Sequence, residues 1–79
     1  MRLIEFALRG DWVPLDALLK ATGLAPSGGF AKRMVGDAQV RVDGAIELRK
    51  RCKVRAGQVV SLSDVRVQVV AAPDLPDTS

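Results

Sequence analysis

Large apolar side chains change their spacing along this chain, and the spacing predicts where strands and helices lie. In residues 3–8 every second side chain is large and apolar, namely Ile4, Phe6 and Leu8. A two-residue period of this kind is typical of a strand with one buried face. The chain is therefore expected to begin with a short N-terminal strand.

A helical spacing follows this strand. From Pro14 to Thr22 the leucines recur at three- and four-residue intervals, which places them on one side of a helix. Proline is favoured in the first turn of a helix, and Gly23 stands where a C-terminal cap belongs. Ser27 can cap a second helix that runs to about Val35. The expected apolar stripe of this second helix consists of Phe30, Ala31, Met34 and Val35.

An Asp-Gly dipeptide between two alternating segments predicts a β-hairpin next. Its loop can hold two residues or three, and the length decides which side chains share a face. A two-residue loop would place Val40 opposite the charged Glu47. A three-residue loop ending at Gly44 would place Val40 opposite Ile46 and would put Leu48 on the same face. We therefore expect the three-residue loop, with Gly44 in the left-handed conformation.

Two further short strands are expected towards the C-terminus, where Val65, Val67 and Val69 would face one way. The order strand, helix, helix and then several strands predicts an α+β fold, with two short helices packed on a small antiparallel sheet. At 79 residues the chain is long enough for one domain, expected to span residues 1–72. Residues 73–79 hold two prolines and two aspartates without any period, so a disordered acidic tail is expected there.

Positive charge gathers in the middle of the chain. The net charge is only +3, but residues 27–57 hold eight basic and three acidic residues, and five of the seven residues from Arg49 to Arg55 are basic. Such clustering favours an anionic partner such as nucleic acid. Runs of charged residues are often ordinary solvated surface, and a loop conformation would remove the alternation of side chains between two faces. We nevertheless favour a strip of cations that binds an anionic partner. In an extended run, one face would carry Arg49, Arg51, Lys53 and Arg55.

The start of the second helix offers another candidate anion site. Gly28 and Gly29 leave the unpaired N–H groups of the first turn accessible, and the helix dipole favours an anion there. Lys32 and Arg33, one turn later, could reach the same anion. The alternative is an ordinary Ser27 cap followed by a solvated face, and the sequence favours neither reading.

Several classes of function are disfavoured. The chain has no histidine, its carboxylates are scattered and it has no Cys/His cluster, so we expect no enzyme, no metal site and no cofactor. Cations near Cys52 would lower the pKa of its thiol, but we favour a small strand residue that faces the core. A single cysteine fits a reducing compartment, and no apolar run is long enough for a signal sequence or a membrane helix. We expect a cytoplasmic protein.

The segment SGGFAKRMV, followed by VRVDGAIELRKRCKVRAGQVV, resembles the alpha-L RNA-binding domain, the module named after the fourth protein of the small ribosomal subunit. The similarity spans about residues 6–70 and is greatest to the small stand-alone bacterial proteins of that class. It implies two helices on a small antiparallel sheet, with RNA bound over the helices and adjoining loops. Ribosomal and enzyme-attached members usually begin the first helix with Arg-Leu-Asp, where this chain has Pro14-Leu15-Asp16. Many members also carry an arginine or lysine where this chain has Gly28.

Charge pattern and resemblance together predict an RNA-binding module that recognises structured RNA, ribosomal or otherwise folded, through backbone phosphates and shape. Aromatic residues are too few for a stacking platform. The alternative is a basic adaptor that binds an acidic partner protein. A monomer is expected, with no membrane partner and no small-molecule substrate. The candidate RNA-binding residues are Ser27, Gly28, Gly29, Lys32, Arg33, Arg41, Arg49, Lys50, Arg51, Lys53 and Arg55.

Overall fold

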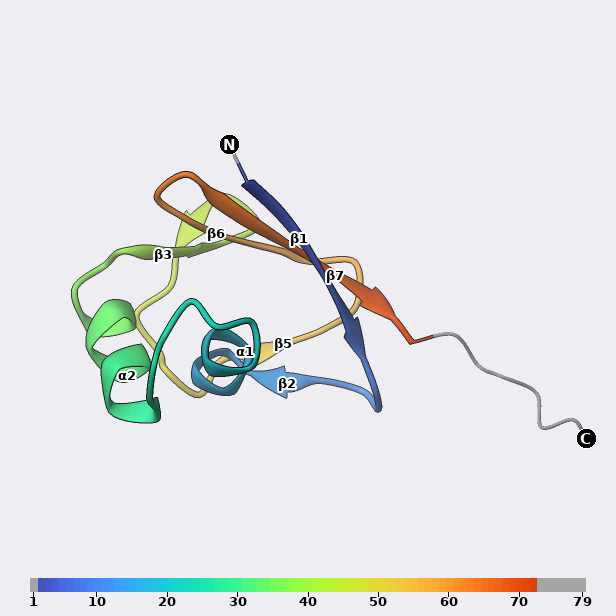
Figure 1. The fold of residues 1–79 in the computed structure, drawn as a ribbon, viewed down its shortest axis with the longest axis horizontal. Helices are drawn as coiled ribbons and strands as arrows, with labels where there is room; N and C mark the ends of the chain where they lie inside the picture. The colour runs from blue at the N-terminus through green and yellow to red at the C-terminus, as the bar shows by residue number, and fades with distance from the viewer. Residues whose placement is uncertain (1, 73–79) are drawn as a thin grey trace, which may run out of the picture.

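Two short helices lie on one side of a five-stranded sheet in the computed structural model, which describes residues 2–72 (Figure 1). The sheet has the strand order β1-β7-β6-β3-β4, and β2 and β5 form a separate two-stranded ribbon. The predicted acidic tail, residues 73–79, lies outside the described residues. In chain order the elements are β1 (Arg2–Leu8), β2 (Val13–Pro14), α1 (Leu15–Ala21), α2 (Gly28–Gly36), β3 (Val40–Val42), β4 (Ala45–Ile46), β5 (Lys53–Val54), β6 (Val59–Leu62) and β7 (Val65–Ala71).

The predicted arrangement of an N-terminal strand and two helices packed on a sheet is confirmed, but the sheet is mixed and not purely antiparallel. Strand β1 runs parallel to β7, while the pairs β3–β4, β3–β6 and β6–β7 are antiparallel. A tight hairpin forces two strands to be antiparallel, but β1 and β7 are joined by almost the whole molecule. No turn therefore fixes their relative direction, and the hydrophobic period of β1 could not reveal it.

The core lies between the helices and one face of the sheet. Leu15, Leu18 and Leu19 of α1 are fully buried, as their helical spacing predicts. Val67 and Val69 of β7 are also buried, and they face the same side of the sheet as the buried residues of β3 and β6. The buried apolar residues are Leu8, Leu15, Leu18, Leu19, Ala25, Ala31, Met34, Val35, Val40, Val42, Val54, Val60, Val67 and Val69.

The predicted burial of Phe30 is wrong, because Phe30 is 46% exposed. Helix α2 buries Ala31, Met34 and Val35. Each residue advances about 100° around a helix axis, so Phe30 lies at the edge of this stripe and not at its centre. The stripe predicted from the sequence therefore included one residue too many.

The predicted three-residue hairpin loop is also wrong. Val42 pairs with Ala45, and the loop holds only Asp43 and Gly44, with φ angles of 52° and 86°. Two successive positive φ angles are typical of a type I′ turn, whose twist matches that of the flanking strands. Ile46 is 51% exposed, so it needs no place on the buried face. The prediction failed because it assumed that every large apolar residue of the hairpin had to be buried.

Asp43 ties this turn to the turn that precedes β6. One carboxylate oxygen, Oδ1, accepts the backbone N–H of Val59 at 3.0 Å, and the other, Oδ2, accepts Nε2 of Gln58 at 3.1 Å. The backbone N–H of Asp43 in turn donates to the carbonyl of Val59 at 2.8 Å. The two hydrogen bonds that the carboxylate accepts, first the one from the Val59 N–H and then the one from Gln58, hold the pKa of Asp43 below its ordinary value of 3.8.

Replacing Asp43 with alanine is expected to destabilise the fold, and Asp43→Asn should do so less, because asparagine keeps an acceptor and tolerates positive φ. A carboxylate with a lowered pKa stabilises the folded state fully above its ordinary pKa and loses that effect as the pH falls through the folded-state value. The difference in unfolding free energy between wild type and Asp43→Asn should thus be constant near neutral pH and shrink below about pH 4. Urea unfolding across this pH range measures the difference in unfolding free energy. A difference that grows in acid would contradict the lowered pKa of Asp43.

Candidate nucleic-acid interface

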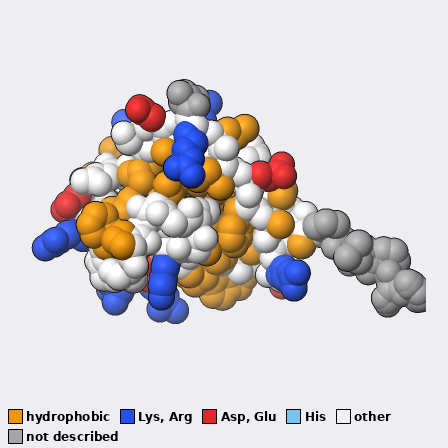
Figure 2. Space-filling model, viewed as in Figure 1, with side chains coloured by type: hydrophobic (Ala, Val, Ile, Leu, Met, Phe, Trp, Pro, Cys, Tyr) orange, Lys and Arg blue, Asp and Glu red, His pale blue; other side chains and the backbone are white. Residues whose placement is uncertain are grey.

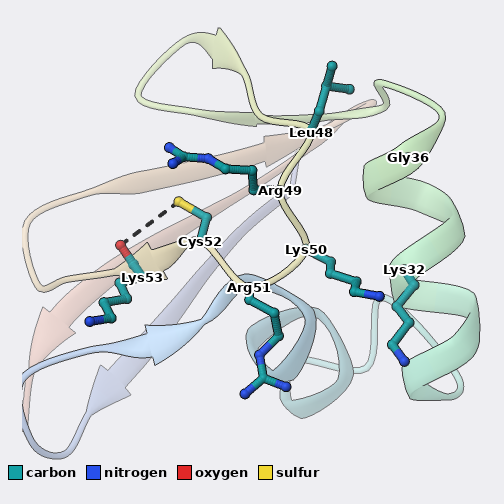
Figure 3. Close-up of a pocket in the computed structure, with 8 residues that line it drawn as sticks. All are labelled: Lys32, Gly36, Leu48, Arg49, Lys50, Arg51, Cys52 and Lys53. Carbon is teal, nitrogen blue, oxygen red and sulfur yellow. Dashed lines mark hydrogen bonds between the residues drawn. The ribbon is translucent and has the colours of Figure 1, made fainter.

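The segment from Leu48 to Lys53, here called the basic loop, forms a turn and not an extended strand. The N–H of Cys52 donates to the carbonyl of Arg49 at 3.1 Å, which closes the turn. Strand geometry begins only at Lys53. Figure 3 shows the side chains of Arg49, Lys50 and Arg51 pointing in three directions. The predicted strip of four alternating cations on one face is therefore wrong, because the chain reverses within it.

The basic loop is fastened to the start of helix α1. No side chain caps this helix. Instead the first N–H groups of α1 donate to the loop, Leu15 to the carbonyl of Cys52 at 2.9 Å and Asp16 to the carbonyl of Lys50 at 3.0 Å. Fully buried Val54, which pairs with Val13, anchors the end of the loop. The loop thus provides the helix cap, and in return the helix holds the loop in one shape.

An open groove of about 880 Å³ lies between α2 and the basic loop. Figure 3 shows Lys32 and Gly36 on the helix side and Lys50 extending from the loop towards Lys32. Five cationic residues and no acidic residue line the groove, so its electrostatic potential favours an anion. The lining residues are Lys32, Gly36, Leu48, Arg49, Lys50, Arg51, Cys52 and Lys53.

One of these cations is already engaged. The Nε atom of Arg49 lies 3.0 Å from Oε2 of Glu47, and the same oxygen accepts the backbone N–H of Arg49 at 3.0 Å. The Arg49 side chain lowers the pKa of the Glu47 carboxyl, and the carboxylate raises the pKa of Arg49 in return. Within residues 2–72 this is the only ion pair, so the other four groove cations have no carboxylate partner among the described residues.

Cys52 is half-buried in the groove and is not the activated thiol that its basic neighbours suggest. Its Sγ donates towards the carbonyl of Lys53 at 4.0 Å, the contact drawn in Figure 3. Burial, and after it the negative charge of Glu47, raises the pKa of the Cys52 thiol despite the opposing effect of Arg49. The thiol is therefore protonated and weakly nucleophilic at neutral pH.

The start of α2 has the predicted Ser27 cap, with Oγ accepting the N–H of Phe30 at 3.2 Å. Gly28 lines a smaller hollow of about 330 Å³ together with Arg51 and Lys20. Arg51 lines both this hollow and the groove, so it connects the two. Anion binding by Ser27, Gly28 and Gly29 remains a prediction.

Three of the cationic candidate residues lie apart from the groove lining, in addition to Ser27, Gly28 and Gly29. Arg33 is exposed on α2, and the backbone N–H of Arg55 donates to Oε1 of Gln58 at 2.7 Å. Arg41 alternates with buried residues of β3, so it projects from the sheet face that turns away from the core. There it lines a separate hollow of about 400 Å³ with Arg66.

Other groove residues were missed as site residues by the sequence analysis. Gly36 was not considered as a site residue, and Leu48 was expected only to share a hairpin face with Val40, yet Leu48 is 62% exposed. Trp12 was not placed, and its ring lies 4.9 Å from Nζ of Lys53, a cation–π distance. This contact depends on the pairing of β2 with β5. The sequence analysis missed that pairing because strands of only two residues are too short to show an alternating hydrophobic pattern.

The surface around these sites mixes charged and apolar groups. Figure 2 shows Lys and Arg side chains spread around the visible face, with hydrophobic side chains exposed between them. In residues 2–72 no three His, Cys, Asp or Glu side chains gather as a set of metal ligands. None of the helices in that range has the length and apolar character needed to cross a bilayer.

Comparison with known proteins places this geometry in a family. The sequence profile of the S4 domain matches residues 6–70. The "Putative RNA-binding protein YbcJ" of Escherichia coli (strain K12) is 54% identical over 59 residues, which are 75% of this chain and 84% of that protein. The "Uncharacterized protein YbcJ" of Shigella flexneri gives the same figures.

A solved structure agrees with the sequence match. The solution structure of E. coli YbcJ, described as revealing an alphaL motif involved in RNA binding, superposes with a TM-score of 0.62 at 45% sequence identity. The superposition covers 90% of this chain and 89% of that one. The resemblance to the alpha-L RNA-binding domain is thus confirmed at the level of both sequence and fold. This chain belongs to the S4 domain family.

Proposed function

We propose that this protein is an RNA-binding module that recognises structured RNA through backbone phosphates and shape. The observation that carries the proposal is the groove between α2 and the basic loop, in which five cations and no acidic residue gather from two elements. The RNA-binding descriptions given to the YbcJ relatives support the same reading.

Phosphate recognition suits the donors present. Lysine ammonium and arginine guanidinium groups bond strongly to phosphate oxygens, and four of the five groove cations have no carboxylate partner within residues 2–72. The hydrogen bonds from α1 hold the basic loop at a fixed position beside α2. Cations fixed on two separate elements favour an RNA whose phosphates are also held at a fixed spacing, which is a folded RNA and not a flexible strand.

The proposal also covers the kind of RNA, the cellular location and the oligomeric state. The RNA is ribosomal RNA or another folded RNA, and the protein acts as a cytoplasmic monomer. The basic adaptor for an acidic protein is the competing function, and no observation in the structure favours it over RNA.

Salt dependence of binding tests the proposal. If the four cations without a carboxylate partner each neutralise one phosphate, log affinity should fall against log salt with a slope of about −3 to −3.5. Fluorescence anisotropy of a labelled RNA hairpin gives the affinity, and fluorescence of Trp12, the single tryptophan, should respond because its ring contacts Lys53. Binding of a labelled polyglutamate peptide that matches or exceeds RNA binding would favour the adaptor and overturn the proposal.

A further inference from the structure

Two arginines flank a serine on the sheet face that is turned away from the helices. Arg41 of β3 pairs with Ser61 of β6, and Ser61 pairs with Arg66 of β7, so the three residues form one row across three neighbouring strands. Residues paired in this way project from the same face of a sheet. Neighbouring strands lie about 4.8 Å apart, which places the two arginine Cα atoms about 10 Å from each other. Both arginines are exposed, and the serine between them is half-buried.

These three residues line one hollow of about 400 Å³, and no acidic residue belongs to its lining. Glu5 is on the same sheet face and Asp64 is in the adjoining turn, but neither lines the hollow, and neither forms an ion pair with Arg41 or Arg66. The hollow therefore favours an anion. Two guanidinium groups and a serine hydroxyl are donors that suit phosphate oxygens.

The hollow adjoins the groove around the end of α2, where the chain turns into β3 (Figure 1). Gly36 lines the groove, whereas Ala38 and Gln39 line the hollow. Successive Cα atoms are 3.8 Å apart, so Gly36 and Ala38 are separated by less than about 8 Å. A Cβ atom added at Gly36 would meet no other atom within 4 Å, so the space beside it is open. A ligand that leaves the groove past Gly36 therefore reaches the hollow after rounding one turn.

A long polyanion suits the hollow better than a small free anion. Because Arg41 and Arg66 are exposed, water and salt screen their attraction for an anion that binds there alone. An RNA already held in the groove presents its next phosphates at a high effective concentration. The path bends from the helix side to the outer face of the sheet, and a duplex resists bending over so short a length. The RNA segment that follows this path is therefore single-stranded.

We propose that a single-stranded flank of the RNA bound in the groove rounds the end of α2 and places its backbone phosphates at Arg41 and Arg66 on the outer face of the sheet. The inference rests on the proposed function and deepens it. It names the class of RNA that the protein prefers, a folded element joined to a single strand.

Two RNAs test the inference, a short hairpin that fills only the groove and the same hairpin with a single-stranded extension of about twelve nucleotides at each end. The variant Arg41→Gln/Arg66→Gln should bind the extended RNA at least about tenfold more weakly than wild type at about 0.1 M salt. Its slope of log affinity against log salt should be shallower by about 1.4, the value for two contacts to a single strand. The short hairpin should bind the two proteins within about twofold, because only the net charge differs. Fluorescence anisotropy measures each affinity.

The matched control is Arg2→Gln/Arg9→Gln, which removes the same charge from exposed arginines outside the hollow. It should weaken binding of the extended RNA by no more than about threefold. Equal losses in the two variants, or no loss in Arg41→Gln/Arg66→Gln, would overturn the inference. The proposed function would still stand if wild type bound the short hairpin, whereas binding to neither RNA would remove both.

A labelled polyglutamate peptide distinguishes RNA from an acidic protein as the occupant of the hollow. If Arg41→Gln/Arg66→Gln lost binding to this peptide and kept full affinity for the extended RNA, the hollow would be a protein contact and the inference would be overturned. Circular dichroism checks that both variants fold, which is expected because all four arginines are exposed.

Discussion

Neutralising three loop cations together, in the variant Lys50→Gln/Arg51→Gln/Lys53→Gln, is expected to weaken RNA binding about a hundredfold or more at about 0.1 M salt. Each phosphate contact contributes to affinity by releasing counterions, and near that salt concentration one contact is worth roughly five- to eightfold. The slope of log affinity against log salt should become shallower by about two to three. Anisotropy titrations of one RNA hairpin at several salt concentrations measure both quantities.

The matched control removes the same charge elsewhere, in Arg2→Gln/Arg9→Gln/Arg66→Gln. These three arginines are exposed, lie on or next to β1 and β7, and do not line the groove. The control variant should lose only a fewfold in affinity, through the lower net charge of the whole protein. If both variants lost affinity equally, binding would depend on total charge and the groove would not be the interface.

Truncating Leu18 is the second change with a large expected effect, which is a loss of unfolding free energy. Leu18 is fully buried in α1, so Leu18→Ala should cost about 3 to 5 kcal/mol in unfolding free energy. A domain of this size has a total stability of roughly 4 to 12 kcal/mol. Much or all of the stability would then be lost, and RNA binding would fall with it because α1 holds the basic loop through its first N–H groups. Urea unfolding followed by circular dichroism gives the value.

Lys20→Ala is the control in the same helix, since Lys20 is exposed. Its unfolding free energy should stay within about 0.5 kcal/mol of wild type. A loss below about 1 kcal/mol for Leu18→Ala would contradict the packing of α1 against the sheet.

Sequence patterns predicted the elements better than their pairing. The helices were placed within one or two residues, because Pro14, Gly23 and Ser27 mark their ends and the buried leucines have helical spacing. The Asp-Gly hairpin was also found, but its loop length was wrong because Ile46 is exposed and does not constrain the register. The parallel direction of β1 depends on a partner at the other end of the chain, which no local pattern encodes.

Several candidate residues line one groove, but the shape of the basic loop was not predicted. The cations at 49, 50, 51 and 53 line one groove, and Lys32, which the sequence analysis assigned to a separate site at the start of α2, lines the same groove. The turn within the basic loop was missed, because a run of charged residues has no hydrophobic period from which to read its backbone. Arg41 was also a candidate, and the alternation of β3 turns it to the sheet face away from the core.

The parallel pairing of β1 with β7 has a consequence for how the chain folds as it is synthesised. Strand β1 is at the edge of the sheet, and β7 is its only strand neighbour in the described structure, from Arg2 opposite Val65 to Leu8 opposite Ala71. During synthesis β1 leaves the ribosome before β7, so β1 stays without this partner until the segments between them and β7 itself have emerged. Such long-range pairing is slow to form, and an unpaired apolar strand attracts other chains. Docking of β1 is therefore expected to be a late folding step, and a chain interrupted before β7 should aggregate.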